Sequence, residues 1–220
     1  MPSKKWFALA LAWPLIVAAA SWPKVPVPEA TQSTMVARRM IFNGLDMQAR
    51  MFRSQKSQAE IIDFYRKAWH GKAVVNPMGE AKVIGHREGD YYITIKVSDY
   101  AGGSKGEIGI VDVGDAPKHF EPGKGLPRPM GSKVFNDIRY PDDPVPARTV
   151  AMTNTLSPLQ NAGYFRERLE GDGWKPDGRQ RCTDPDACVQ HYSRGDSHLT
   201  LVAERGRSGY SKVIINVQRP

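Results

Sequence analysis

Apolar side chains recur at spacings of three and four in two well separated stretches of the chain. Residues 57–69 read SQAEIIDFYRKAW, and residues 157–169 read SPLQNAGYFRERL. Each stretch begins with a serine that is followed three residues later by Glu60 or Gln160, which is the pattern of a capping box. The sequence therefore predicts two N-capped amphipathic helices, each with an apolar stripe that packs on a sheet.

Alternating apolar and polar residues flank both helices, as in half-buried strands. The first helix is preceded by a predicted strand at 45–54 and followed by strands at 81–86, 91–97 and 106–113. The second is preceded by a strand at 148–156 and followed by strands at 188–193, 197–204 and 210–217. We expect an α+β fold of two repeated β-α-β-β-β units, each an antiparallel sheet with one helix packed across a face.

Composition divides the chain into five segments. Residues 1–22 form an apolar leader, residues 23–44 a Pro-containing tether, and residues 114–147 a crossover dense in Pro and Gly. Such a crossover cannot hold a long helix, although a short strand at 133–139 fits. The two folded units are then expected at 45–113 and 148–220.

The leader predicts the compartment. Lys4 and Lys5 precede an apolar run that ends in small residues, as in a secretory signal peptide that is cleaved after Ala20. An uncleaved N-terminal anchor in the inner membrane stays open as an alternative. Both interpretations place the body outside the cytoplasm, in the periplasm or the medium in the first case.

The expected order of elements resembles the helix-on-sheet modules of bacterial envelope assembly proteins, including the helix-grip lobes of outer-membrane assembly lipoproteins. The resemblance covers both units, lies in the architecture, and transfers no functional residue. It implies a role in the cell envelope.

Cys182 and Cys188 are the only cysteines of the chain. In an exported protein we expect them to form a disulfide that closes a short loop. Zinc bound with His191 and His198 is the alternative, but the spacing is not that of a zinc finger. No metal or cofactor is expected.

The chain carries 31 basic and 23 acidic residues, a formal net charge of +8. Several of the basic residues precede the first helix or lie on the outward sides of the two helices, and they form the candidate binding face: Arg50, Arg53, Arg66, Lys67, Arg166 and Arg168. In an envelope location, such a face fits an anionic glycan or lipid surface, or an envelope protein. No nucleic acid is expected, because the aromatic residues occupy positions that should face the core.

No catalytic motif is present: neither Gly-x-Ser-x-Gly, nor His-Glu-x-x-His, nor a phosphate-binding loop. We therefore predict a non-enzymatic binding or assembly module of the cell envelope and assign no catalytic residue. Two alternatives remain. One is an enzyme with its site in the cleft between the units, and the other is a membrane-anchored accessory subunit of an envelope complex.

Overall fold

A computed structural model describes residues 21–178, 180–206 and 209–219. The helices in this part of the chain are α1 (Gln58–Ala68) and α2 (Pro158–Gly171). The strands of the first half are β1 (Thr31–Phe42), β2 (Leu45–Ser54), β3 (Val74–Met78), β4 (Ala81–Glu88), β5 (Tyr91–Tyr100) and β6 (Gly103–Asp112). Those of the second half are β7 (Lys133–Tyr140), β8 (Ala147–Asn154), β9 (Lys175–Pro176), β10 (Arg181–Asp184), β11 (Ala187–Arg194), β12 (Ser197–Arg205) and β13 (Ser211–Gln218).

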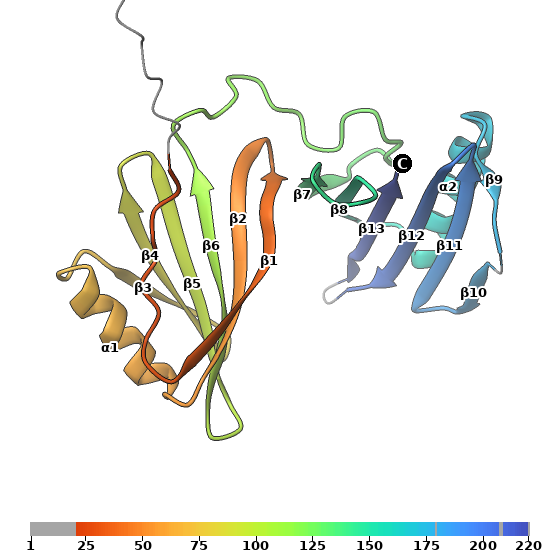
Figure 1. Ribbon diagram of the computed structural model, residues 1–220. Helices are drawn as coiled ribbons and strands as arrows, with labels where there is room; N and C mark the ends of the chain where they lie inside the picture. Colours follow the sequence, from red (N-terminus) through yellow and green to blue (C-terminus); the bar gives the residue numbers. More distant parts are fainter. Residues whose placement is uncertain (1–20, 179, 207–208, 220) are drawn as a thin grey trace, which may run out of the picture.

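All these strands belong to one sheet, which extends through the whole described molecule (Figure 1). The strand order is β10-β11-β12-β13-β8-β7-β1-β2-β6-β5-β4-β3, and β9 pairs with β11. In each half the last strand returns to the second strand of a hairpin: β6 pairs with β2, and β13 pairs with β8. Every pairing is antiparallel, so short hairpin turns suffice for most connections.

The predicted fold class is wrong. The chain does not form two repeated β-α-β-β-β units with a sheet each, but a single large, mostly antiparallel sheet of thirteen strands with two helices in the described residues. The physical reason is that the two halves are hydrogen-bonded to each other through β1 and β7. Sequence periodicity indicates where strands lie but not which strands lie next to each other.

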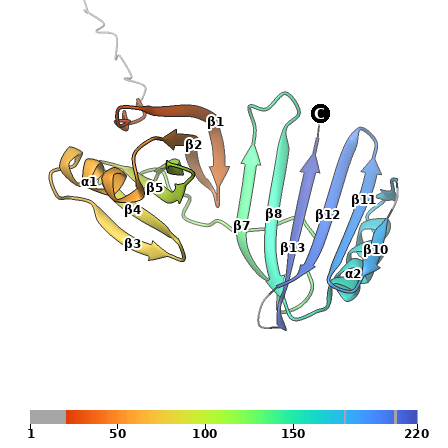
Figure 2. The same ribbon diagram turned by 90° about the horizontal axis from the view of Figure 1, so that it is seen from below.

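The junction between the halves is short, and it lies where β1 and β7 are neighbours (Figure 2). β1 and β7 share two residue pairs, Ile41 with Arg139 and Phe42 with Ile138. Asn43, in the turn that follows β1, extends this pairing. Its backbone N–H donates to the Asp137 carbonyl at 2.9 Å, and its side-chain Oδ1 accepts from the Asp137 N–H at 2.9 Å. The Asn43 side chain thus continues the pairing where the strand itself has ended.

Residues 23–44, expected to form a tether, are folded onto the first half over much of their length. Val25 is buried in the core of the first half, and the ring of Trp22 lies 5.3 Å from that of Tyr91. The Tyr65 hydroxyl donates to the Pro26 carbonyl at 3.0 Å. Residues 31–42 then form β1, which lies in the middle of the sheet. Apolar side chains between the prolines therefore fasten this segment to the folded body.

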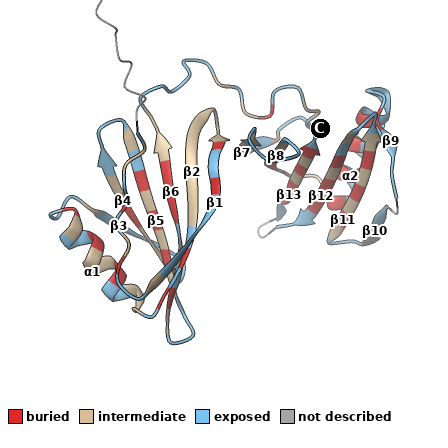
Figure 3. Cartoon of the chain, viewed as in Figure 1, coloured by how far each residue is buried: buried red, intermediate tan, exposed pale blue. Residues whose placement is uncertain are grey.

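Both predicted helices and their capping boxes are confirmed. In α1 the Ser57 side chain accepts from the Glu60 N–H while Glu60 accepts from the Ser57 N–H, and Ser157 and Gln160 do the same in α2. Each helix packs on the sheet over its own core. Buried positions alternate along the strands beneath the helices (Figure 3). The core under α1 is built around Tyr65, and the core under α2 around Phe165.

The predicted leader lies almost wholly outside the described residues, so its cleavage remains a prediction. Within the described part of the chain, no helix is long and apolar enough to cross a membrane.

Candidate functional site

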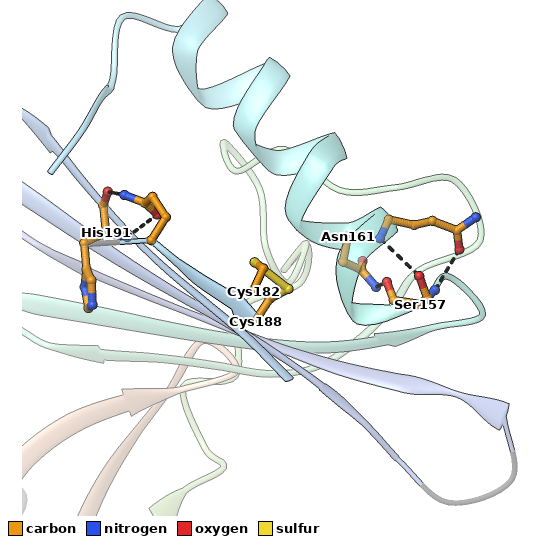
Figure 4. Close-up of a disulfide and its surroundings, with 7 residues drawn as sticks. Ser157, Asn161, Cys182, Cys188 and His191 are labelled. Atoms are coloured by element: carbon orange, nitrogen blue, oxygen red, sulfur yellow. Dashed lines mark hydrogen bonds between the residues drawn. A yellow bond between two sulfur atoms is a disulfide. The ribbon is translucent and has the colours of Figure 1, made fainter. Parts of the chain in front are cut away.

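The cysteine prediction is confirmed, because Cys182 and Cys188 are joined by a disulfide with Cα atoms 4.2 Å apart. Figure 4 shows this disulfide next to α2. Cys188 is buried in the core under α2. His191 lies three residues further along β11, so its side chain points to the opposite face of the sheet. Its ring Nδ1 lies 3.1 Å from the Thr200 hydroxyl, an arrangement that leaves the cysteines and this histidine on different sides.

The structure distributes the candidate binding face over three places. Arg50 and Arg53 are on β2, Arg66 and Lys67 on α1, and Arg166 and Arg168 on α2. The two helices contact different strands, α1 lying on β4 and β5 and α2 on β9, β11 and β12. The helix cations also have local partners. Arg66 pairs with Asp63 at 3.8 Å, and the Arg168 guanidinium lies 5.8 Å from the centre of the Tyr164 ring.

A different surface, on the side of the first-half sheet away from α1, combines exposed apolar and basic side chains. Two adjoining hollows of about 590 and 620 Å³ lie there and share Met51, Lys96 and Glu107 in their walls. We call them together the open-face trough. β1 lines one wall and β3 and β4 the other, although β2, β6 and β5 lie between them in the sheet. The sheet of the first half is therefore curled, with the trough on its inner side.

One end of the trough is apolar. Several of its side chains are largely exposed, with relative accessibilities of 56% for Val36, 56% for Met51 and 58% for Met78. The apolar residues that line this end are Val36, Phe42, Met47, Ala49, Met78 and Val83, and the polar residues Arg50, Thr94 and Asn136 lie among them.

Small side chains on neighbouring strands make the trough deeper at its floor. Register places Ala49, Gly109, Thr94 and Gly85 opposite one another across β2, β6, β5 and β4. A Cβ atom on Gly109 would lie 2.8 Å from the Met47 methyl, which shows how closely that flexible side chain covers the glycine. The floor can therefore be reshaped by movement of a methionine, a side chain that adapts easily to irregular surfaces.

The other end of the trough is cationic and is formed by Arg53, Lys96 and Lys105. Arg53 and Lys105 are directly opposite each other on β2 and β6. Both lie over one ring, with the Lys105 ammonium 4.5 Å and the Arg53 guanidinium 5.5 Å from the centre of Tyr100. Cation–π contact offsets part of the repulsion between these like charges.

Acidic groups are scarce at this end. Glu107 is cross-strand from Lys96 and lines both hollows. Among the described residues, no carboxylate lies within ion-pair distance of Arg53 or Lys105. The cationic end thus has an excess of positive charge that an anionic ligand could neutralise.

The crossover contributes a smaller polar hollow of about 440 Å³, lined by Lys118, His119, Glu121 and Arg139 among others. Glu121 is already paired with Arg128 at 3.2 Å. The described residues contain no cluster of three or more His, Cys, Asp or Glu side chains that could hold a metal ion.

Asp137, a buried carboxylate with a shifted pKa, supports the junction of the two halves. Burial alone would raise the pKa of Asp137, but two hydrogen bonds from Arg148, at 2.7 and 2.9 Å, and one from the Gly123 N–H outweigh burial and lower it. With both oxygens already bonded inside the protein, Asp137 serves the fold.

No protein-family model, no curated protein and no solved structure matches this chain. The function must therefore be argued from the site itself.

Sequence reasoning found only part of this site. Arg50 and Arg53 belonged to the candidate binding face. The alternation of Met47, Ala49 and Met51 correctly indicated a strand, but these side chains line the open trough, and Phe52 on the other face of β2 is the buried one.

Sequence reasoning did not single out Lys96 or Lys105. Lys96 lies on the polar side of the predicted strand 91–97, whereas Lys105 precedes the predicted strand 106–113, and β6 begins earlier, at Gly103. Both lysines gain meaning only once the register sets Lys105 opposite Arg53.

Proposed function

We propose that the protein is an exported, non-enzymatic binding module of the cell envelope, and that it binds an anionic partner in the open-face trough. The observation that carries the proposal is that one trough holds exposed methionines together with Arg53 and Lys105, which form an ion pair with no carboxylate among the described residues. Contiguous exposed apolar surface rimmed by polar residues is typical of binding surfaces.

The chemistry of the trough favours binding over catalysis. Its lining contains no histidine and one carboxylate, Glu107. A general acid–base mechanism needs at least one positioned proton donor or acceptor, and most such sites hold convergent titratable groups. The trough offers charge attraction and apolar contact, which suit the capture of a partner.

Site-specific photo-cross-linking in living cells tests the binding surface. A photoreactive amino acid replaces Met51 in the trough, and a control carries it at Leu159, a residue on α2 of similar exposure, 59% against 56%. We expect an adduct in the envelope fraction from position 51 and none from position 159. Equal yields from both positions, or no adduct at 51, would refute the trough as the binding surface.

The location of the protein in the cell is tested by a separate experiment. We propose that the leader is cleaved after Ala20 and that the body is released outside the cytoplasm. The disulfide supports an oxidising compartment. N-terminal sequencing of protein purified from envelope fractions should begin at Ser21. A sequence beginning at Met1 or Pro2 would instead indicate the membrane-anchored form.

A further inference from the structure

We propose that the partner held in the open-face trough is an anionic amphiphile with a single extended acyl chain. The headgroup would bind Arg53 and Lys105, and the chain would lie along the apolar end. This inference rests on the proposed function and specifies the chemical class of the ligand.

The cationic end fits an anionic headgroup. Arg53 and Lys105 are neighbours on adjacent strands, and like charges placed directly opposite each other are destabilising. Both cations contact the ring of Tyr100. A phosphate or carboxylate between the two would replace repulsion by two charge-assisted hydrogen bonds.

The apolar end fits an acyl chain better than a peptide. The strands of its floor, β2, β6 and β5, already have neighbours on both sides, so a peptide could pair only at the walls, with β3 or with the part of β1 that β7 does not cover. A peptide lying on the floor itself would leave its N–H and C=O groups without partners, at a cost of a few kcal/mol each. An acyl chain has no such groups. The methionines Met47, Met51 and Met78 can adapt to its shape.

The dimensions of the trough also suit one chain. Arg53 and Met47 are at the two ends of the trough on the same strand, six residues apart. At about 3.3 Å per residue, the distance is about 20 Å, which an extended fatty acyl chain spans. The headgroup would therefore contact Arg53 and Lys105 at one end of the trough, and the far end of the chain would reach Met47 at the other.

Three ligands with matched parts test the proposal by isothermal titration calorimetry. They are palmitoyl lysophosphatidylglycerol, palmitoyl lysophosphatidylcholine and glycerol 3-phosphate, and the protein is purified from the envelope so that its N-terminus is native. The first carries a net negative charge, the second has the same chain with a zwitterionic headgroup, and the third has no chain. We expect at least tenfold tighter binding of the first than of the second, and no detectable binding of the third.

Two double variants locate the binding site. Arg53→Gln with Lys105→Gln should reduce the affinity for lysophosphatidylglycerol to that for lysophosphatidylcholine. The control, Arg166→Gln with Arg168→Gln, removes the same charge from α2 and should bind as the wild type does. Circular dichroism and urea unfolding verify that each variant is folded, as expected for substitutions of exposed side chains.

Equal binding of the two lysophospholipids by the wild type, or no effect of the trough variant, would overturn the proposal. If neither lysophospholipid binds while position 51 still cross-links to an envelope protein, the ligand class is wrong and the proposed function stands. If lysophosphatidylglycerol binds but the control variant loses it equally, the headgroup site is wrong.

Discussion

Two glycines of β6, Gly106 and Gly109, have different surroundings, which single substitutions can distinguish. A Cβ atom on Gly106 would collide with the Lys96 carbonyl oxygen and lie 2.6 Å from two carbons of the Phe52 ring. The nearest atom for Gly109 is the flexible Met47 methyl, at 2.8 Å. Because a backbone collision forces the strand to shift, we expect Gly106→Ala to lower the unfolding free energy by about 2 kcal/mol or more.

Gly109→Ala should cost less than about 1 kcal/mol, since Met47 can move aside. Urea unfolding followed by fluorescence measures both values. Equal costs for the two variants would show that the contacts of Gly106 do not limit the packing of the sheet.

At the residue scale, the sequence showed which side chains can react or carry charge, but not which of them lie next to each other. The disulfide followed from two cysteines in an exported chain, because no other pairing existed. The cationic end of the trough could not be predicted, since Arg53 and Lys105 are far apart in sequence and meet only through the pairing of β2 with β6. Such pairings are long-range choices that local patterns do not encode.

At the element scale, the two helix caps are local and far apart, so we expect their effects to add. Ser157→Ala removes the acceptor of the Gln160 N–H, which lies 3.1 Å from the serine oxygen, and Ser57→Ala does the same for Glu60 at 3.3 Å. Each variant should cost about 1 kcal/mol. The double variant should cost their sum within about 0.5 kcal/mol, as for distant sites.

Guanidinium unfolding of the two single variants and the double variant measures these costs. Ser157→Thr, which keeps a capping oxygen, is the control and should lose less than Ser157→Ala. A double variant that differs from the sum by more than about 1 kcal/mol would argue against independent caps.

The helices and most strands were predictable because their signals are local, and β1 shows where this fails. Its alternation is broken by register shifts between Met35 and Ala37 and again between Ala37 and Met40. One available signal was overlooked: Asn43 and Gly44, both with positive φ, form the two-residue turn to β2. Asn-Gly between two extended runs is a strong hairpin signal. The turn predicts a strand before it.

At the scale of the whole molecule, the two halves depend on a small junction. Beyond the two residue pairs of β1 and β7, it contains the Asn43 side chain and the ion pair of Asp137 with Arg148. Asp137 is 1% exposed, and its backbone accepts from and donates to Asn43. Removing its charge would leave the Arg148 guanidinium without the carboxylate that it contacts at 2.7 Å. The stability of the junction therefore depends on pH.

We expect Asp137→Asn to lower the unfolding free energy at neutral pH by about 3 kcal/mol, as for other broken buried ion pairs. The folded pKa of Asp137 lies below its unfolded value. Its stabilisation is therefore complete above the unfolded pKa of about 3.9, and is lost as the pH falls through the folded pKa. The difference between wild type and variant should shrink as the pH falls below about 4, because both then lack the charge.

Urea unfolding from about pH 7 down to about pH 3 measures this difference. Asp142→Asn, at an exposed carboxylate in the turn between β7 and β8, is the control and should show little difference at any pH. A cost for Asp137→Asn that stays constant across this range would mean that the lost stability comes from side-chain packing and not from the charge. A constant cost would also mean that the junction does not depend on the Asp137–Arg148 ion pair. The hydrogen bonds between Asn43 and the Asp137 backbone would then be enough to hold the two halves of the sheet together.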